Sequence, residues 1–453
     1  ITKKEEFVKE FMKENSGDFE AFKETFDYNL NSFKKKGKRT YDFITKAGKK
    51  FQNVVFKLCL IFFKEEKFPE AFKETTLHML YKNNKGRTDV LSNHRFIHCK
   101  QWLPRVAEGL VVQDGLKEQL IKGSSIYQIG GQPGHRSEEL MFVVKSVVAR
   151  QRSRGKIVII QGYDISKYFD KERIEDGVLS CLKRGADPKA VRLWFKLNED
   201  TQIRVRTGAG MSRVGKVGAV IGQGMIGGAL VSQAVLDDGV MEHLPPGGQL
   251  QIEYGDVPLA PVMFMDDILN IAEGLNTQAR KVNEKIDIIM KQRGLSLNRD
   301  KSVFLIMGSK KDIQKASKEL GSNPLMCGEF ETKRTYKYKW LGQTLSSEGL
   351  SDCVMSTVLS REGKIRGACL EIAVVVNDWR CKSVGGMETA MMLWETCCIP
   401  SLLHGAGTWT EIDKQTVKNM NQLQNWYLRL ILQVGPGTPS SSLRWDFQVL
   451  DMS

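Results

Sequence analysis

The feature that most constrains the fold is the position of three aspartates at the ends of hydrophobic, strand-like runs. Asp164 follows residues 158–160, which are Val-Ile-Ile, and the adjacent pair Asp266 and Asp267 lies between hydrophobic flanks. A carboxylate beside a buried strand is costly to desolvate unless a cation neutralises it. Adjacent carboxylates also repel each other, and Mg²⁺, which prefers oxygen ligands, relieves that repulsion. The pattern favours a divalent-metal site where strand ends meet.

Such aspartate pairs also have a simpler interpretation. Asp-Asp is a common dipeptide, and Asp237-Asp238, followed by a glycine, is typical of an ordinary helix end or turn. Asp266-Asp267 alone has the same alternative. Its combination with Asp164 at the end of a second strand favours a functional site.

Length and charge narrow the class of protein. The chain has 453 residues, of which 41% are hydrophobic, so it holds about three structural units with a sizeable core. Intrinsically disordered and collagen-like classes are excluded by this composition. Lys and Arg (67) exceed Asp and Glu (53), which gives a net charge of +14 and favours a polyanionic partner.

Cysteine usage and hydropathy bear on the compartment. The nine cysteines are scattered and contain no C-x-x-C pair, so we expect reduced thiols in a cytosolic or nuclear protein that is not secreted. No hydrophobic signal-peptide core follows the first basic residues, and the chain looks trimmed from a longer one. Residues 217–236 lack charge, but their glycines and polar side chains favour a buried functional segment over a membrane helix.

Hydrophobic periodicity predicts the main secondary structure. Two helices are expected in residues 3–33, and the basic segment 34–50 is either a solvated linker or an arm that faces nucleic acid. The further expected elements are a buried helix over 51–63, a strand over 157–160, a hairpin over 250–271, a helix over 282–292, a strand over 302–307 and a mainly helical region over 358–432. Asp170 is expected to cap a helix that begins at residue 171.

Several segments resemble the motifs of reverse transcriptases, in the form seen in non-LTR retrotransposons and group II introns. Residues 163–170 (YDISKYFD) resemble motif A, and residues 264–267 (FMDD) resemble the aromatic-x-Asp-Asp box of motif C. The other resemblances are residues 82–87, 92–97 and 128–137 to the fingers blocks, 222–224 (GQG) to motif B, 294–298 with Lys301 to motif D, 338–342 (YKWLG) to the primer-grip motif E, and 399–405 and 423–434 to the thumb. Each motif alone is weak, but together they follow the family's order.

The resemblance implies an α+β right-hand polymerase fold whose palm contains an antiparallel sheet. The implied regions are a basic helical N-terminal extension (1–50), fingers (51–157, with an insertion at 171–215), a palm (158–348) and a helical thumb (349–453).

The resemblance also implies an activity, that of an RNA-directed DNA polymerase. A primer 3′-hydroxyl would attack the α-phosphate of a dNTP on an RNA template, with a DNA or RNA primer. Asp164 and Asp266 would bridge two Mg²⁺ ions, for which Mn²⁺ can substitute, and Asp267 would be a weaker or indirect ligand. No membrane partner is implied, and the oligomeric state is left open.

Further residues acquire nucleotide-binding roles by the same resemblance. Phe169 would press on the sugar of the incoming nucleotide and reject a 2′-hydroxyl, Gln223 and Gly224 would lie beside template and nucleotide, and Lys82 and Arg95 would hold the triphosphate. The alternatives are a core aromatic for Phe169 and surface charge for the two cations. Gly227-Gly228 departs from the small residue and proline usual in motif B, which leaves the start of the following helix open.

Two remaining assignments have equally plausible structural alternatives. Lys301 would protonate the leaving pyrophosphate or be a solvated lysine. Trp340, Leu341 and Gly342 would grip the primer end or pack in the core.

Two other functions compete with this one: a non-catalytic RNA-binding protein that has kept the fold, and an RNA polymerase. Retention of all three aspartates argues against the first, and Phe169 argues against the second. The sequence shows no endonuclease signature and leaves the parent element, whether mobile, intron-encoded, domesticated or defensive, undetermined.

Overall fold

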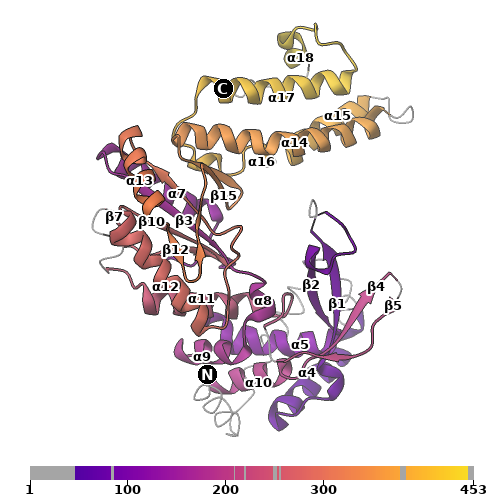
Figure 1. Ribbon diagram of the computed structural model, residues 1–453. Helices are drawn as coiled ribbons and strands as arrows, with labels where there is room; N and C mark the ends of the chain where they lie inside the picture. The colour runs from indigo at the N-terminus through magenta and orange to yellow at the C-terminus, as the bar shows by residue number, and fades with distance from the viewer. Residues whose placement is uncertain are drawn as a thin grey trace. The chain divides into compact units, whose positions relative to one another are not determined.

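The computed structural model describes residues 46–82, 86–208, 210–218, 221–247, 252–254, 257–377 and 384–446 (Figure 1). The helices expected in residues 3–33 and most of the basic segment lie outside these residues. The chain forms two compact units. The first comprises Ile1–His135, Tyr163–Leu269 and Val282–Arg299, and the second comprises Arg136–Gly162, Asn270–Lys281 and Asp300–Ser453. The region boundaries implied by the resemblance remain a prediction.

The first unit combines helices with a mixed sheet. Its helices are α4 (Gly48–Glu65), η1 (Glu70–Phe72), η2 (Leu91–Asn93), α5 (Trp102–Val111), the π-helical turn η3 (Val112–Leu116), α6 (Lys117–Lys122), α8 (Tyr168–Lys171), α9 (Ile174–Lys183), α10 (Pro188–Asn198), α11 (Gly228–His243) and most of α12 (Arg280–Gln292). Its strands are β1 (Glu74–Tyr81), β2 (His94–Lys100), β4 (Gln202–Thr207), β5 (Gly210–Met211), β6 (Gly215–Lys216), β7 (Ile252–Tyr254), β8 (Val257–Leu259) and β9 (Val262–Phe264).

One sheet of this unit has the strand order β2-β1-β4-β5, and β6 also pairs with β4. β1 and β2 form an antiparallel hairpin in which Leu80 lies opposite Arg95, whereas β1 and β4 run parallel. A parallel pair needs a long connection. Helices α5 to α10 lie between these two strands in the sequence and supply it.

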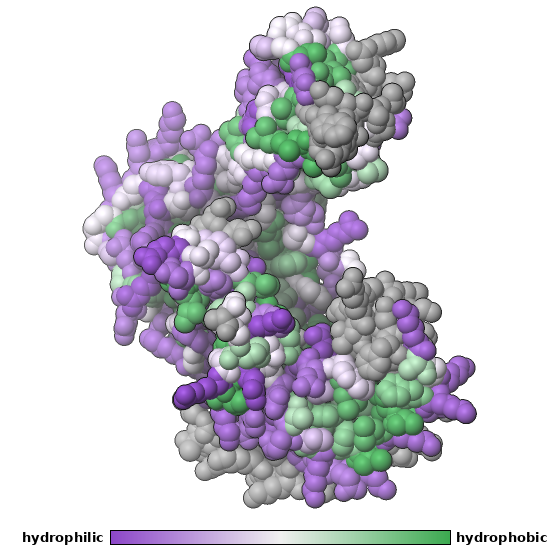
Figure 2. Space-filling model, turned by 90° about the vertical axis from the view of Figure 1, so that its right-hand side faces the viewer, coloured by the Kyte–Doolittle hydropathy of each residue, from purple (hydrophilic) through white to green (hydrophobic). Residues whose placement is uncertain are grey.

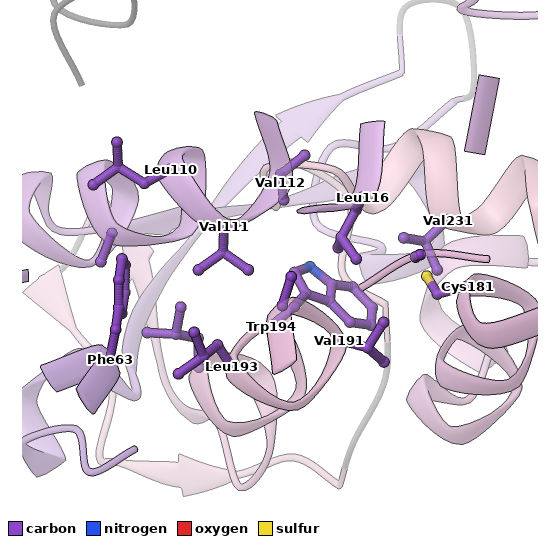
Figure 3. Close-up of a cluster of buried hydrophobic side chains, with 14 of the residues drawn as sticks. Phe63, Leu110, Val111, Val112, Leu116, Cys181, Val191, Leu193, Trp194 and Val231 are labelled. Carbon is purple, nitrogen blue, oxygen red and sulfur yellow. The ribbon is translucent and has the colours of Figure 1, made fainter. Parts of the chain in front are cut away.

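The core of the first unit is a helical cluster. Trp194, on α10, is fully buried, and Figure 3 shows its ring beside Leu116 and Val191. α10 begins as capping rules predict, because Asp187 accepts hydrogen bonds from the first-turn backbone and Pro188 occupies the first position. Each fully buried large apolar side chain stabilises the fold by about 1.5–3 kcal/mol.

The second unit contains the rest of the chain. Its helices are α7 (Ser137–Ser153), η4 (Leu275–Ala279), α13 (Lys310–Ser322), α14 (Leu350–Asn377), α15 (Val384–Leu393), η5 (Trp394–Cys398), α16 (Ile399–Leu402), η6 (Ala406–Thr408), α17 (Lys414–Leu432) and α18 (Ser440–Asp446). Its strands are β11 (Val303–Met307), β12 (Met326–Cys327), β13 (Phe330–Glu331), β14 (Lys333–Arg334), β15 (Lys337–Trp340) and β16 (Gln343–Ser346).

A second five-stranded sheet has the order β14-β11-β3-β10-β9, with β3 at Val158–Asp164 and β10 at Asp267–Ala272. β11 runs antiparallel to β3 and parallel to β14. Ile159 and Phe304 of this sheet pack with Ala316 of α13 in a small hydrophobic core. β3 begins with Val158, Ile159 and Ile160, and all of its residues except Asp164 are buried, as in a strand covered on both faces.

The helices that follow form their own core, in which α14 and α17 lie side by side (Figure 1). The rings of Trp394 and Tyr427 stack there with centroids 4.6 Å apart. The surface of these helices, at the top of Figure 2, mixes hydrophobic and hydrophilic residues. Val374 is the most exposed of the large hydrophobic residues on α14, at 73%.

The structure confirms most of the elements expected from periodicity. β3, α12, β11 and the helical region all form where they were expected. The single hairpin expected over 250–271 is instead two, β7–β8 and β9–β10, and the carboxylate pair lies at the turn of the second. The helix expected over 51–63 is α4, but only one side of it is buried, since Val54 is 60% exposed. Among the described residues no helix is long and apolar enough to cross a membrane. The eight described cysteines form no disulfide.

Two local expectations were wrong. Asp170 lies inside α8, and the next helix, α9, begins at Ile174 without a side-chain cap. Asp237 and Asp238 form no exposed turn. Both lie in α11, where the Arg184 guanidinium contacts them at 2.8 and 2.9 Å. These carboxylates are buried because a cation from another helix neutralises them.

Candidate functional site

The pair Asp266-Asp267 lies at a tight turn of the first unit. Phe264 of β9 pairs with Asp267 of β10, so Met265 and Asp266 form a two-residue hairpin loop. Met265 has a φ of +60°, and Asp266 is not among the residues with positive φ. That sign pattern is typical of a type II′ turn, whose first position usually holds glycine. The loop places both carboxylates, half-buried, at the edge of the sheet.

Asp164 is the last residue of β3, the strand next to β10 in the sheet. Its backbone carbonyl accepts a hydrogen bond of 2.7 Å from the Asn298 amide, and the Ser166 amide donates to the Ser296 carbonyl at 2.8 Å. Two backbone contacts thus fix the segment that leaves β3.

Tyr168, four residues beyond Asp164, links this segment to the β9–β10 turn. Burial raises the pKa of Tyr168 well above its ordinary value, and the negative charges of Glu172 and Asp266 add to the shift. Asp266 therefore lies close enough to α8 to act on it electrostatically.

The oxygen-rich donor set suits Mg²⁺. Among the residues that the structure describes, no group of three or more His, Cys, Asp and Glu side chains lies close enough together to hold a metal ion. A nucleotide-bound Mg²⁺ does not need such a group, because it keeps waters and is usually held by one or two carboxylates together with substrate phosphates. The side chains present fit a site of that kind.

The short helix α8 holds Phe169 through its buried neighbour. The Tyr168 hydroxyl lies 2.5 Å from the Ser232 carbonyl and 2.9 Å from Glu172 Oε1. Both acceptors are fixed within the first unit and hold Tyr168 in place. Burial raises the pKa of Glu172 to about 8. Phe169 itself is half-buried.

Packing within the protein requires the two glycines of the Gly-Gln-Gly segment (222–224). The His98 amide of β2 donates to the Gln223 carbonyl at 2.7 Å. A Cβ at Gly222 would lie 2.6 Å from the His98 ring, and one at Gly224, whose φ is +106°, would lie 2.7 Å from the His98 carbonyl oxygen. Close packing against β2 excludes larger residues here. The half-buried Gln223 side chain is left as the part of this segment that can reach a ligand.

Lys82 and Arg95 both belong to the β1–β2 hairpin. Arg95 is exposed on β2, and the Lys82 amide donates to the Asn93 carbonyl at 2.8 Å. Burial raises the pKa of Asp170, and the charges of Lys167 and Lys82 oppose this rise. Lys82 is therefore near α8, the helix that carries Phe169.

The other predicted residues belong to the second unit. Lys301 is exposed in the turn before β11. Trp340 is 2% exposed, as core packing requires, and Leu341 and Gly342 form the turn between β15 and β16.

Sequence reasoning missed the polar side chains that hold this second turn. Arg361 of α14 donates to the carbonyls of Gly342, Leu402 and His404 at 2.6–2.9 Å. Lys145 of α7 donates to Gln343 Oε1 at 2.7 Å. Their partners lie from 19 to 198 residues away in the sequence, so no local pattern indicates them.

No protein-family model matches the chain, and no curated protein is similar to it. Solved structures of telomerase are similar at a low level. One from Candida tropicalis, an apo form truncated from its C-terminal domain, is 12% identical with a TM-score of 0.41, over 62% of this chain and 54% of that chain. Telomerase from Candida albicans in complex with a TWJ fragment of telomeric RNA is 10% identical with a TM-score of 0.44, over 85% of this chain and 68% of that chain. This chain thus spans about half the length of the first of these structures.

Proposed function

We propose that this protein is an RNA-directed DNA polymerase of the non-LTR retrotransposon and group II intron type. The observation that carries the proposal is that β3 and β10 are adjacent strands of one sheet. Asp164 lies at the end of β3, and Asp266-Asp267 lies at the start of β10. Two carboxylate-bearing strand ends, read together with the ordered motifs of the sequence, support nucleotidyl transfer.

In this proposal the protein contributes mainly position and charge. Asp164 and Asp266 would hold two Mg²⁺ ions together with the dNTP phosphates, and Asp267 would assist. Bound there, Mg²⁺ neutralises the charge that develops on the transferring phosphate and acidifies the primer hydroxyl. The tight turn and the backbone contacts of Asp164 and Ser166 would keep the carboxylates oriented before substrate arrives.

The nucleotide side of the site would be formed by α8 and the β1–β2 hairpin. Tyr168 is anchored by two hydrogen-bond partners, so its neighbour Phe169 has little freedom to retreat from a 2′-hydroxyl. Lys82, whose charge acts on α8, and Arg95 would bind the triphosphate, and Gln223 would contact the base pair. Template and primer backbones would be attracted by the net positive charge.

The test is Mg²⁺-dependent extension of an oligo(dT) primer on poly(rA), with dTTP and with UTP in parallel reactions. Wild type should incorporate dTTP and reject UTP. Asp266→Ala and Asp164→Ala should abolish extension while primer–template binding, measured by fluorescence anisotropy, stays within about threefold.

Glu118→Ala is the matched control, because Glu118 is an exposed carboxylate that forms an ion pair with Lys122 on α6. It should extend primers like wild type. Extension by Asp266→Ala at the wild-type rate would refute the site. Preferential UTP incorporation would show an RNA polymerase, and binding without any extension by wild type would show an RNA-binding protein.

A further inference from the structure

A single buried side chain, Gln128, forms hydrogen bonds with both backbone groups of Met265. Its Nε2 donates to the Met265 carbonyl at 3.0 Å, and its Oε1 accepts from the Met265 amide at 3.1 Å. The same Oε1 accepts from the Gly130 amide at 3.2 Å. Gln128 is fully buried, with 0% exposure. The amide therefore acts toward Met265 as the backbone of a neighbouring strand would.

The backbone around Gln128 fixes where this amide points. The Met263 amide donates to the Tyr127 carbonyl at 2.7 Å, the Ile129 amide donates to the Met263 carbonyl at 3.3 Å, and Gln128 forms a parallel bridge with Met263. The segment thus runs alongside β9 and stops at the turn. Because Gln128 lies beside Met263 of β9, its side chain reaches the backbone of Met265.

Met265 needs such support because its conformation is unfavourable. A non-glycine residue at a φ of +60° costs about 1–2 kcal/mol relative to an ordinary backbone conformation. Two hydrogen bonds to buried groups contribute about 1–3 kcal/mol, which is enough to offset that cost. Met265 immediately precedes Asp266, so its backbone angles decide where the Asp266 carboxylate points.

Met265 also contacts a second side-chain amide, that of Gln233, and the backbone at Gly130. Gln233 of α11 donates from Nε2 to Met265 Sδ at 2.9 Å. A Cβ at Gly130 would lie 2.2 Å from the Met265 nitrogen, so only glycine allows the chain to pass there. Both contacts limit the movement of Met265, and both come from sequence-distant segments.

We propose that Gln128 is a positioning residue that holds the Met265-Asp266 turn in its metal-binding conformation. The assignment to metal binding rests on the proposed function, whereas the clamp itself does not. A neutral amide suits this place: it offers one donor and one acceptor, and adds no charge beside Asp266 and Asp267. A glutamate would lose the donor and repel both the Met265 carbonyl and the carboxylates.

The test uses the full-length protein and three variants. Gln128→Met keeps the side-chain length and removes all three side-chain hydrogen bonds, and Gln128→Glu keeps only the acceptor. Gln151→Met is the control, because Gln151 of α7 is 1% exposed and undergoes the same chemical change in the other unit.

Hydrogen–deuterium exchange of the peptide that spans the turn is the first readout. Gln128→Met should raise the exchange rate of the Met265 amide about tenfold, the equivalent of one lost hydrogen bond, with smaller changes elsewhere. Gln128→Glu keeps the acceptor of the Met265 amide, so it should raise this exchange rate by less than Gln128→Met does, and Gln151→Met should leave the turn unchanged. Unchanged exchange in a folded Gln128→Met variant, or equal acceleration over the whole first unit, would overturn the clamp.

Manganese binding, followed by electron paramagnetic resonance without substrate, is the second readout. Both Gln128 variants should bind Mn²⁺ about tenfold more weakly than wild type, and the Mg²⁺ concentration for half-maximal extension should rise in parallel. Faster exchange with unchanged Mn²⁺ binding would refute the positioning role. A wild type that binds no Mn²⁺ and extends no primer would refute the proposed function, and the exchange result would stand separately.

Discussion

The β9–β10 turn and the β15–β16 turn have the same length but different backbone conformations. Each is a two-residue hairpin loop, Met265-Asp266 in the first unit and Leu341-Gly342 in the second. Only the first residue has positive φ in the former, whereas both do in the latter, at +46° and +79°, as in a type I′ turn. Methionine and leucine are both unusual where φ is positive.

The two turns are held by side chains of different chemistry. Uncharged Gln128 holds Met265 through both of its backbone groups, and Arg361 holds Gly342 through its carbonyl alone. An amide adds no charge beside the two carboxylates, whereas a buried cation there would compete for them with the Mg²⁺ of the proposed function. No such restriction applies at the second turn, where a guanidinium can satisfy three carbonyls at once. The chemistry of each turn thus matches the charge of its surroundings.

The largest expected effect is the loss of stability when the side chain that supports the β15–β16 turn is replaced. Arg361→Met leaves three carbonyls, one buried and two part-buried, without this donor, and should lower the free energy of unfolding by about 3–5 kcal/mol. Arg366→Met, five residues on in α14, removes only an i,i+4 pair with Glu362 and a contact with a Trp426 ring, and should cost about 1 kcal/mol or less. Urea denaturation measures both. Equal losses would show that Arg361 is no special support for the turn.

The next prediction concerns how the stability of each unit depends on pH. Burial raises the pKa of Glu172 from 4.5 to about 8, so the stability that it contributes is present below pH 4.5 and is lost as the pH rises through 8. Burial lowers the pKa of Lys145 from 10.5 to about 8, so its contribution is present above pH 10.5 and is lost as the pH falls through 8.

Glu172→Gln should therefore remove on the order of 2–4 kcal/mol of the stability loss between pH 5 and pH 9 in the first unit. Lys145→Met should instead reduce the change in stability of the second unit between pH 8 and pH 10.5. Hydrogen exchange of peptides from each unit, measured across this pH range, distinguishes the two. A Glu172→Gln variant with the wild-type pH profile would contradict the raised pKa of Glu172.

A smaller effect tests close packing at the first turn. Gly130→Ala places a Cβ 2.2 Å from the Met265 nitrogen, and because backbone atoms cannot move aside cheaply it should cost about 1–3 kcal/mol. Primer extension should fall by more than tenfold. Gly208→Ala meets no described atom within 4 Å and should leave both properties unchanged. Activity of Gly130→Ala at the wild-type level would mean that the turn tolerates displacement.

The smallest expected effect improves the second turn. Asparagine adopts positive φ more readily than leucine, and Asn-Gly is the preferred pair in type I′ turns, so Leu341→Asn should stabilise the second unit by about 0.5–1 kcal/mol. The β-branched variant Leu341→Val should destabilise it by a similar amount. Thermal denaturation measures the two shifts. A destabilised Leu341→Asn would indicate that contacts of the leucine side chain outweigh the backbone preference.

The sequence predicted those parts of the fold that depend on local pattern. A continuous β-branched run indicated β3, whose residues are buried from Val158 to Tyr163, and helical spacing indicated α12, one face of which is buried. It failed for Asp170, since local capping chemistry was outweighed by the anchoring of Tyr168 within α8. It failed for Asp237 and Asp238 because Arg184, their partner, is more than 50 residues away. The roles of the candidate site residues remain predictions.

The sequence by itself determined which carboxylates end which strands, and hence which chemistry the site can attempt. Only the tertiary structure decided which side chains hold the turns, because Gln128 and Met265 are 137 residues apart and Arg361 and His404 are 43 apart. Hydrogen bonds between such distant residues depend on how the strands and helices pack, and a lone glutamine or arginine carries no periodic signal. Composition and spacing therefore specify the reactive groups, and packing specifies their orientation.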